Sequence, residues 1–454
     1  KMAEDFNFER MELCNNLIYL TPATFQNRYL FVRFRNLNAD KLVSYVVLDE
    51  IHCLSNWGHD FRPEYLMLSK NLNKYLDRTP FLGFTATANY TVVEDIQKQL
   101  GIPQDNFYSP IAFEKYNASY HYESYESMEA LFEAVCEIAN KIVNAGERAI
   151  IFTKNDHISA KVADAIGYEA DVFLTSNPQA YYQFADGLCK VLVTSEELGV
   201  GINFSNVTNI IHFGMPISKN EYVQEIGRAG RGEEHIHSYV LFLEPTPDNV
   251  DPLLLKREAE INHTAQILAH MDNDYSDVYH KLSMNADTSD VLMDRLIDIY
   301  SDFRQRARAL YVIPYDVDTV EEAKQYLYML YACGYISDWY SYKSLDKQRK
   351  IEIMIDISST NHDFYSQEEN MIARMRKRAT DYFVFRGNDR KSISQIARAS
   401  TAEEIIGVYV EWYYEKYLYH HKEEFLDMYS FIITNKDGNV ERITDEIKEY
   451  FILP

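Results

Sequence analysis

An apolar run that ends in two adjacent carboxylates is the sharpest chemical signal in this sequence. Val46–Leu48 is apolar, and Asp49 and Glu50 follow it directly. Mg²⁺ prefers oxygen ligands and keeps several of its waters, which suits a carboxylate such as Asp49. The neighbouring Glu50 can then accept a proton from an attacking water. The pattern indicates a strand that presents an acidic pair for nucleotide hydrolysis, although such a pair on its own also occurs in solvated loops.

An unusually aromatic run follows the acidic pair. Residues 53–65 read C-L-S-N-W-G-H-D-F-R-P-E-Y, which closely resembles the loop that follows the D-E-x-H box in RecQ helicases. In that family the loop senses single-stranded DNA and relays its presence to the ATP site. The resemblance implies that Trp57, Phe61 and Arg62 contact DNA and that His59 couples the two sites. Aromatic faces stack on any base and arginine adds a phosphate or cation–π contact, whereas the plain alternative is an aromatic loop that fills a core.

Further short motifs occur in the order that a superfamily-two helicase requires. They are Tyr19–Pro22, Phe84–Ala88, Ile150–Thr153, Val193–Ser195 and Gly199–Asn203. The resemblance implies DNA contacts for Thr21, Pro22, Thr153 and Thr194. It implies contacts at the nucleotide site for His52, Thr85, Thr87, Gly201 and Asn203. Each motif consists of common residue types, so the order of the set carries the inference.

The last motif is nearly as telling as the first. Residues 224–232 read Q-E-I-G-R-A-G-R-G. Arg228 and Arg231 are three residues apart and therefore lie on one side of a helical turn. Such a pair can direct two guanidiniums at the γ-phosphate and stabilise the charge that develops during phosphoryl transfer, while Gln224 orients water or phosphate. The alternative is a basic turn on the surface.

The elements that must position these motifs form two α/β blocks. In the first block the expected buried strands are Leu17–Leu20, Val43–Leu48 and Phe81–Phe84, and Thr91–Leu100 is an expected helix. In the second block the expected strands are Ala149–Phe152, Val191–Val193, Asn209–His212 and Tyr239–Leu243, and Ser127–Val143 is an expected helix. Repeated strand-then-helix order predicts parallel sheets covered by helices. With the resemblance, the prediction is an α/β fold of two RecA-like lobes, residues 1–115 and 116–245, the first of them truncated.

Residues 246–454 show little strand pattern and are expected to be a mainly helical accessory region. Leu253–Asp302 and Gln367–Leu453 are polar and helical in pattern, and Glu321–Cys333 is a helix with an apolar face. A tight turn and a probable hairpin that ends at Lys350–Ile357 follow that helix. The order of helix, turn and hairpin predicts a winged-helix-like element near residues 320–357.

The densest basic cluster of this acidic protein lies in the accessory region. It consists of Arg374, Arg376, Lys377, Arg378, Arg386, Arg390 and Lys391. One interpretation is a surface that guides duplex or single-stranded DNA into the motor. The other is a solvated helix face whose cations pair with the many acidic neighbours.

The resemblance covers about residues 16–244 and has three departures. No G-x-x-x-x-G-K-[ST] phosphate loop occurs in the 454 residues, and in the family this loop precedes the T-P motif. Since that loop holds most of the phosphate contacts, this stretch alone is expected to bind ATP poorly and to lack activity. The segment Tyr168–Gly187 is shorter than expected between its flanking motifs. The four-cysteine zinc module that commonly follows a RecQ motor is missing, so the resemblance implies nothing about the residues beyond 245.

Composition bounds the class of protein. The formal net charge of −24 makes broad, sequence-blind coating of DNA unfavourable but allows a narrow track of local donors and aromatics. Five scattered cysteines, at positions 14, 53, 136, 189 and 333, argue against a disulfide framework and a thiolate zinc site. No apolar run approaches the length that spans a bilayer, and the charged start is unlike a signal peptide, so an intracellular protein is expected.

The leading hypothesis is an ATP- and Mg²⁺-dependent DNA helicase or translocase of RecQ type. Single-stranded and partly duplex DNA are its expected partners, and the acidic C-terminal region is an expected surface for proteins. The alternative is a non-hydrolysing, motor-derived DNA-binding or scaffold subunit of a larger complex. These motifs do not distinguish DNA from RNA, because both strands offer phosphates and stackable bases.

Overall fold

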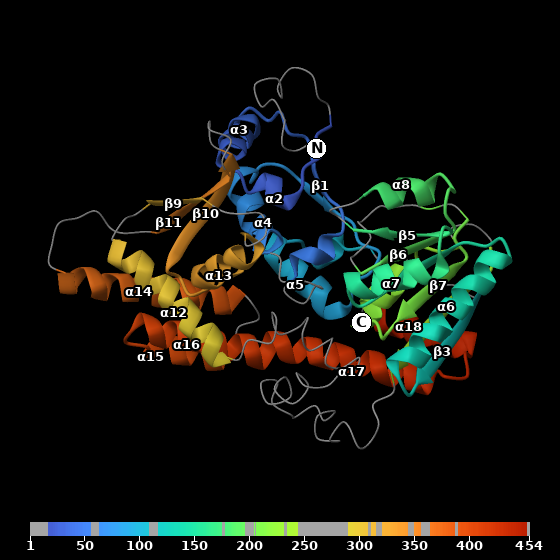
Figure 1. Cartoon of the computed structure of the whole chain (residues 1–454). Coiled ribbons are helices and arrows are strands. Elements are labelled where there is room, and N and C mark those ends of the chain that lie inside the picture. Colours follow the sequence, from blue (N-terminus) through green and yellow to red (C-terminus); the bar gives the residue numbers. More distant parts are fainter. Residues whose placement is uncertain are drawn as a thin grey trace. The chain divides into compact units, whose positions relative to one another are not determined.

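The computed structural model divides the chain into two units, each described here by itself (Figure 1). Unit 1 takes its described residues from Lys1–Thr85, Thr91–Tyr108 and Ser289–Tyr417, and unit 2 from Ala86–Tyr90, Ser109–Thr288 and Leu418–Pro454. The structure describes residues 17–55, 63–108, 117–174, 178–195, 204, 206–230, 234–243, 289–306, 310–314, 320–343, 349–355, 364–385 and 389–451. Residues 289–417 thus group with the first block and residues 418–454 with the second. The predicted boundaries at 115 and 245 stay predictions.

Unit 2 is built on a six-stranded parallel sheet. Its strands are β3 (Ala118–Tyr125), β4 (Ala149–Phe152), β5 (Ala170–Phe173), β6 (Val191–Thr194), β7 (Asn209–Phe213) and β8 (Ile236–Leu243). Their order is β3-β8-β7-β4-β6-β5, and each neighbouring pair is parallel. Every residue of β4, β6 and β7 is buried, as expected for central strands covered on both faces. The predicted parallel sheet is confirmed.

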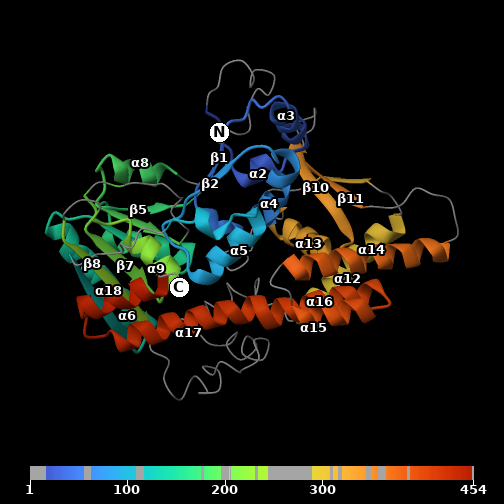
Figure 2. The ribbon, with the colours of Figure 1, turned by 180° about the vertical axis from the view of Figure 1, so that it is seen from behind.

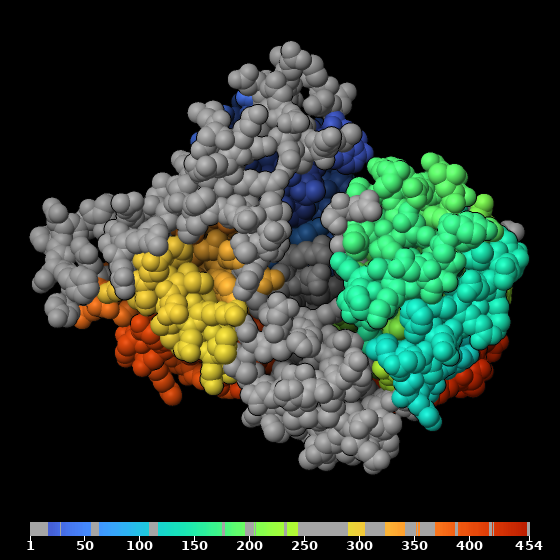
Figure 3. All heavy atoms as spheres, viewed as in Figure 1, coloured from blue at the N-terminus to red at the C-terminus, as the bar shows by residue number. Residues whose placement is uncertain are grey.

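Helices cover both faces of this sheet. Helix α6 (Met128–Asn144) packs on β3, β7 and β8, and α7 (Asp156–Ile166) packs on β5 and β6. In Figure 3 these two helices, in cyan and green, form part of the visible surface of the unit, and α8 (Gln179–Ala185) packs on β5 and β6. Helices α9 (Lys219–Ile226) and α18 (Val440–Phe451) lie on the opposite face (Figure 2). The Ser127, Asn155 and Ser218 side chains cap the N-termini of α6, α7 and α9 by accepting backbone hydrogen bonds.

The first block of unit 1 contains a small parallel sheet. Strands β1 (Val46–Leu48) and β2 (Phe81–Gly83) pair in parallel. The prediction of buried strands is wrong for the described residues, because the exposed fractions are 58% for Val47 and 45% for Leu82. The predicted strand Leu17–Leu20 is also wrong: it has no strand pairing, and the chain leads instead into a short helix.

Four helices and two short 3-10 turns complete the first block. They are α2 (Pro22–Phe25), α3 (Arg28–Ala39), α4 (Pro63–Tyr75), α5 (Tyr90–Leu100), η2 (Ile51–Leu54) and η3 (Gln104–Asn106). The Thr-Pro pair explains the start of α2, because Thr21 is the N-cap and accepts a hydrogen bond from the Thr24 amide while Pro22 takes the first helical position. Helix α5 confirms the helix expected over Thr91–Leu100.

The accessory part of unit 1 combines an antiparallel sheet with helices. Strands β9 (Leu310–Pro314), β10 (Ile336–Lys343) and β11 (Arg349–Ile355) have the order β10-β11-β9. The helices are α12 (Ser289–Arg306), α13 (Val320–Ala332), α14 (Phe364–Phe385), α15 (Arg390–Arg398) and α16 (Ala402–Trp412), followed by the π-helical turn η4 (Tyr413–Leu418). The predicted helix, turn and hairpin are therefore present, and β9 adds a strand that the sequence did not predict.

A glycine makes the turn between α13 and β10. Gly334 has φ +78°, and a Cβ at this position would lie 2.7 Å from the Met375 carbonyl oxygen. The Gly334 amide donates to the Tyr331 carbonyl, and the Tyr335 amide donates to the Leu330 carbonyl. These bonds close the end of α13 in the manner of a left-handed C-cap, so a side chain at Gly334 is excluded by conformation and by space.

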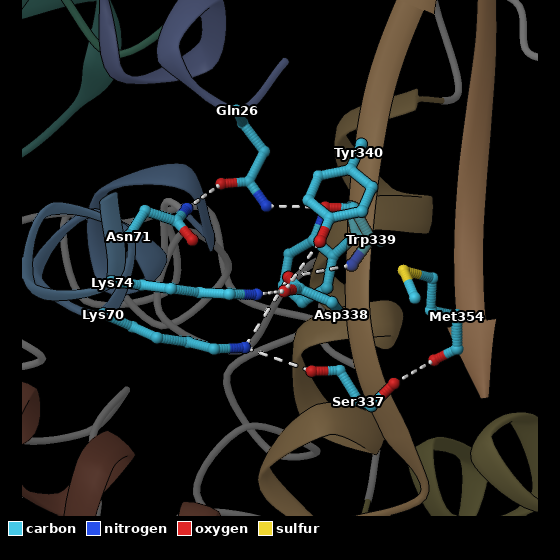
Figure 4. Close-up of polar contacts among 9 residues, drawn as sticks. All are labelled: Gln26, Lys70, Asn71, Lys74, Ser337, Asp338, Trp339, Tyr340 and Met354. Atoms are coloured by element: carbon cyan, nitrogen blue, oxygen red, sulfur yellow. Dashed lines mark hydrogen bonds and ion pairs between the residues drawn. The ribbon is translucent and has the colours of Figure 1, made fainter. Parts of the chain in front are cut away.

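Polar contacts join β10 to helix α4 (Figure 4). The Asp338 carboxylate receives Lys74 at 3.3 Å and Lys70 at 3.6 Å, and Lys70 also donates to the Ser337 carbonyl at 3.1 Å. Gln26 donates to the Trp339 carbonyl at 2.7 Å and accepts from Asn71 at 2.6 Å. The accessory sheet and the first block therefore share one buried polar interface.

The C-terminal helices belong to unit 2. Helix α17 (Tyr419–Thr434) contacts α9, and α18 contacts β3. Together with α12 to α16 they confirm the mainly helical character predicted for the accessory region. Among the described residues, no helix combines the length and the apolar character that crossing a membrane requires.

Candidate active site

The acidic pair lies in a tight turn at the carboxyl end of β1. Asp49 is exposed and Glu50 is half-buried. The Glu50 amide donates to Asp49 Oδ1 at 3.1 Å, and Glu50 itself has φ 48°, a left-handed conformation. The Phe84 amide donates to the Leu48 carbonyl at 2.8 Å, and the Ile51 amide donates to the Phe84 carbonyl at 2.9 Å. The two strand ends therefore fix the turn, and strain is concentrated at the residue expected to act as the base.

Space beside the turn is also restricted. A Cβ on Gly83 would lie 2.2 Å from Ile51 Cδ1. A larger residue at the end of β2 would therefore have to displace the end of the Ile51 side chain, which follows Glu50 directly.

His52 connects the acidic pair to the T-A-T motif. Its Nδ1 lies 2.8 Å from Thr85 Oγ1 and 3.2 Å from Glu50 Oε2, and the ring is 5% exposed. Burial lowers the pKa of His52, but the contacts of its ring with Cys53 and with the Glu50 carboxylate outweigh burial and raise the pKa to about 9. The imidazolium form therefore supplies positive charge beside Glu50 at neutral pH.

Unit 1 should lose stability in a defined pH window because of His52. A pKa raised from 6.5 to about 9 in the folded state gives stabilisation that is complete below pH 6.5 and is lost as pH rises through about 9. Across this pH window the free energy of unfolding of the parent should fall by on the order of 2 kcal/mol more than that of the His52→Gln variant. Urea unfolding of parent and variant at pH 6 and pH 9.5 measures it. His157→Gln, at an exposed site, is the control, and equal pH dependence in parent and His52→Gln would contradict the assignment.

Helix α5 holds the start of the aromatic run. Ser55 Oγ donates to Asp95 Oδ2 at 2.7 Å, and Gln99 Nε2 donates to the Leu54 carbonyl at 2.9 Å and to Asp95 at 3.0 Å. Ser55, Asp95 and Gln99 are all buried. Sequence reasoning missed this network, although two polar residues four apart on the apolar face of a helix are a usable signal.

The middle of the aromatic run lies outside the described residues. Trp57, His59, Phe61 and Arg62 fall in the segment 56–62 that the structure does not describe. Their predicted contacts with DNA therefore stay predictions. The structure shows that side-chain contacts hold the residues on both sides of this segment, Ser55 and Glu64.

In unit 2, helix α9 carries the last motif. Gln224 Nε2 donates to Thr87 Oγ1 at 2.6 Å, so the second hydroxyl of the T-A-T motif meets the first residue of the Q-x-x-G-R motif. Glu225 Oε2 lies 2.7 Å from His212 Nε2 of β7. These contacts fix the helix at two successive residues, and the sequence did not predict either partner.

The arginine pair follows the helix rather than lying on it. Helix α9 ends at Ile226, and the Arg228 and Ala229 amides make short turn bonds to Glu225 and Ile226. Arg228 thus lies in a turn directly after the helix, and the prediction that the two arginines share one side of a helical turn stays a prediction. Gly230 has φ +60°, and a Cβ there would lie 2.2 Å from Ile236 Cγ2. Arg231 lies outside the described residues, so its role stays a prediction.

The other site residues predicted in unit 2 differ in their exposure and in whether the structure describes them. Thr153 Oγ1 lies 2.6 Å from Ser159 Oγ and 3.3 Å from the Thr194 carbonyl. Thr194 is fully buried at 0% exposure, while the Ser195 hydroxyl next to it donates to Asp156. In this arrangement Thr194 shapes the strand end and Ser195 offers the accessible hydroxyl. Gly201 and Asn203 lie outside the described residues.

The basic cluster is partly neutralised. Lys391 lies 2.9 Å from Glu411 and 2.8 Å from Glu415, and these two contacts raise the pKa of Lys391. Arg386 lies outside the described residues. Lys391 thus follows the solvated, acid-paired interpretation, and the DNA-guiding interpretation of the other cations stays a prediction.

A magnesium ion fits one position of the site. The exposed Asp49 carboxylate offers oxygen to a cation that keeps most of its waters. Among the described residues, no group of three or more histidine, cysteine, aspartate or glutamate side chains could hold a metal by itself. The fit is therefore to a hydrated ion held chiefly by nucleotide phosphates rather than to a protein cage.

Two families of known proteins match the chain. Residues 3–96 match the family described as DEAD/DEAH box helicase, and residues 130–233 match the helicase conserved C-terminal domain. The chain is 33% identical over 232 residues to an ATP-dependent DNA helicase RecQ of Pasteurella multocida, covering 50% of this chain and 36% of that protein. It is 28% identical over 274 residues to the RecQ-like DNA helicase BLM of Xenopus laevis, covering 58% of this chain and 20% of that protein.

Solved structures give a weaker likeness. One of S. cerevisiae Dbp5 bound to RNA and ADP BeF3 aligns with a TM-score of 0.38 and 17% identity, covering 56% of this chain and 67% of that chain. The sequence matches span about a third or less of the length of the two RecQ relatives.

Proposed function

We propose that this chain is the motor of a RecQ-like superfamily-two DNA helicase, which couples ATP hydrolysis to movement along single-stranded DNA and to duplex unwinding. The observation that carries the proposal is the acidic turn at the end of β1, where His52 lies 3.2 Å from Glu50 and 2.8 Å from Thr85. A carboxylate held beside an imidazolium and a hydroxyl is equipped to handle the proton of an attacking water. DNA is favoured over RNA because the RecQ relatives are DNA helicases by name.

The hydrolytic step divides between the two residues of the acidic pair. Asp49 would hold a hydrated Mg²⁺ ion, which would supply positive charge to neutralise the phosphate oxygens. Glu50 accepts the proton of the attacking water. His52 keeps the Glu50 carboxylate oriented, and the Thr85 hydroxyl contacts the same ring nitrogen, Nδ1, that faces Glu50.

The second lobe supplies the charge that phosphoryl transfer requires. Arg228 and Arg231 stabilise the developing negative charge on the transferred phosphoryl group. Gln224, whose amide nitrogen lies 2.6 Å from Thr87 Oγ1, reports the state of the nucleotide site to the T-A-T motif. Trp57, Phe61 and Arg62 contact the single strand and signal that it is bound.

ATP hydrolysis measured with different nucleic acids tests this function. The ATP-hydrolysing protein should turn over at least about tenfold faster with single-stranded DNA than with duplex DNA or with no DNA, because only an unstacked strand offers base faces to aromatic side chains. Equal stimulation by RNA would identify an RNA motor instead. DNA binding without any hydrolysis would favour a scaffold subunit and overturn the proposal.

Residues 1–454 by themselves should bind ATP weakly. Without a G-x-x-x-x-G-K-[ST] segment, most of the backbone donors that hold the β- and γ-phosphates are missing. We expect a Kd above about 1 mM for a fluorescent ATP analogue, a free energy of only about −4 kcal/mol. A Kd in the low micromolar range would show that these residues hold the triphosphate without such a loop.

A further inference from the structure

The C-terminal helices of unit 2 reach the helix that carries the Q-x-x-G-R motif. Helix α17 packs against α9 on the same face of the six-stranded sheet (Figure 2). The Phe431 ring of α17 lies 6.2 Å from the rings of both Tyr122 and Tyr222. Tyr222 is fully buried and precedes Gln224 by two residues. The aromatic packing therefore brings the C-terminal segment next to the site residue Gln224.

Helix α18 adds a polar contact at its last turn. The Tyr450 hydroxyl accepts a hydrogen bond from Asn89 Nδ2 at 3.1 Å and donates to Glu424 Oε1 at 3.5 Å. The Tyr450 ring lies 5.4 Å from the Nζ of Lys219, the first residue of α9. Burial raises the pKa of Tyr450, so the hydroxyl stays protonated and can accept and donate at once.

The segment Ala86–Tyr90 is consequently held at two alternate residues. Thr87 accepts a hydrogen bond from Gln224 at 2.6 Å, and Asn89 donates one to Tyr450. Thr87 is buried at 2% exposure. Because only one residue separates the two anchors, we expect a displacement of Asn89 to shift the Thr87 hydroxyl.

We infer that Tyr450 is a positioning residue of the motor, which holds Asn89 and thereby keeps Thr87 within hydrogen-bond reach of Gln224. This inference rests on the proposed function, in which Gln224 and Thr87 act at the nucleotide site. Misplacement of a catalytic neighbour by a fraction of an ångström affects the reacting geometry more than it affects nucleotide binding. The C-terminal helix α18 therefore contributes to the geometry of the nucleotide site.

The variant Tyr450→Phe tests the inference in the ATP-hydrolysing protein. It removes one hydroxyl and keeps the ring over Lys219. We expect kcat to fall about fivefold, the equivalent of one net hydrogen bond, with the KM for ATP and the affinity for single-stranded DNA unchanged. In a double-mutant cycle with Asn89→Ala, the combined variant should lose no more than Tyr450→Phe alone, because Tyr450→Phe has already removed the contact that Asn89→Ala breaks.

Tyr120→Phe is the matched control. Tyr120 is buried in the same unit, and among the described residues its hydroxyl has no hydrogen-bond partner. Its kcat should stay within about 1.5-fold of the parent. An unchanged kcat for Tyr450→Phe, equal losses in both tyrosine variants, or additive losses in the cycle would each overturn the inference.

Hydrogen–deuterium exchange separates this inference from the proposed function. Tyr450→Phe should speed exchange in the peptide that contains residues 86–90 by about fivefold, and Tyr120→Phe should not. Faster exchange in a protein without ATPase activity would support the contact and defeat the proposed function. Unchanged exchange in a protein with DNA-stimulated ATPase would defeat the positioning role alone.

Discussion

Glu50→Gln is expected to lower ATP hydrolysis by at least about 10²-fold while DNA binding stays nearly intact. The amide keeps the size of the side chain and its place beside His52, 3.2 Å away in the parent, but it cannot accept a proton. Steady-state ATPase and fluorescence anisotropy with labelled single-stranded DNA measure the two effects. Binding is spared because the residues proposed to contact DNA, from Trp57 to Arg62, are separate from the acidic turn.

The control for this change is a glutamate without a role in the site. Glu137 on α6 forms an exposed pair with Lys141 at 2.7 Å, and such a surface pair contributes little to stability. Glu137→Gln should therefore leave both turnover and binding unchanged. Undiminished turnover in Glu50→Gln would remove Glu50 as the base, whereas parallel loss of hydrolysis and DNA binding would point to general damage to the lobe.

The same substitution has a second consequence at His52. The Glu50 carboxylate is one of the groups that raise the His52 pKa to about 9. A neutral amide at position 50 should lower that pKa, so the loss of stability with rising pH should begin at a lower pH. The pH dependence of unfolding thus reports on the Glu50–His52 contact independently of turnover.

The central strands of unit 2 were predictable because burial on both faces leaves an unbroken apolar pattern. Ala149–Phe152 was predicted with the bounds that β4 has, and Val191–Val193 differs from β6 by one residue. The edge strands β3 and β5 were missed. Strand β3, with the sequence A-S-Y-H-Y-E-S-Y, alternates between buried and partly exposed residues, and its tyrosines, histidine and glutamate do not read as an apolar run.

The opposite error occurred in the first block. Leu17–Leu20 is as apolar as β1, yet Leu17 is 67% exposed and Tyr19 is 85% exposed. A short apolar run predicts a strand only when neighbouring strands exist to pair with it, and in the described part of unit 1 the parallel sheet has two strands. Local pattern cannot reveal whether a pairing partner is present.

Contacts among the candidate site residues were predictable where a motif is contiguous and unpredictable where they span the chain. Asp49, Glu50 and His52 form one turn because they are neighbours in sequence. Gln224 and Thr87 are 137 residues apart, and Asn89 and Tyr450 are 361 apart. Only the fold brings such pairs together, and a glutamine or tyrosine in an amphipathic helix gives no sign of its distant partner.

Lys324→Met is expected to give the largest loss of stability in unit 1. Lys324 of α13 forms an ion pair with Glu64 in the first turn of α4, and the side chains are 9% and 8% exposed. Removing one partner leaves the other charge buried without compensation, which costs about 3–5 kcal/mol. The midpoint of the urea transition that unfolds unit 1 measures the loss. Because α4 begins directly after the aromatic run, DNA-stimulated ATPase should fall in parallel.

Removing both charges distinguishes the pair from simple loss of packing. The double variant Lys324→Met with Glu64→Leu replaces two buried charges by apolar groups and should recover most of the stability, since such replacements are often neutral or better. Lys98→Met is the matched control, because Lys98 pairs with Glu94 at 2.9 Å on the surface of α5 and should contribute less than about 0.5 kcal/mol. Two results would contradict a buried ion pair between α13 and α4. In one, Lys324→Met is as stable as the parent; in the other, the double variant is no more stable than Lys324→Met.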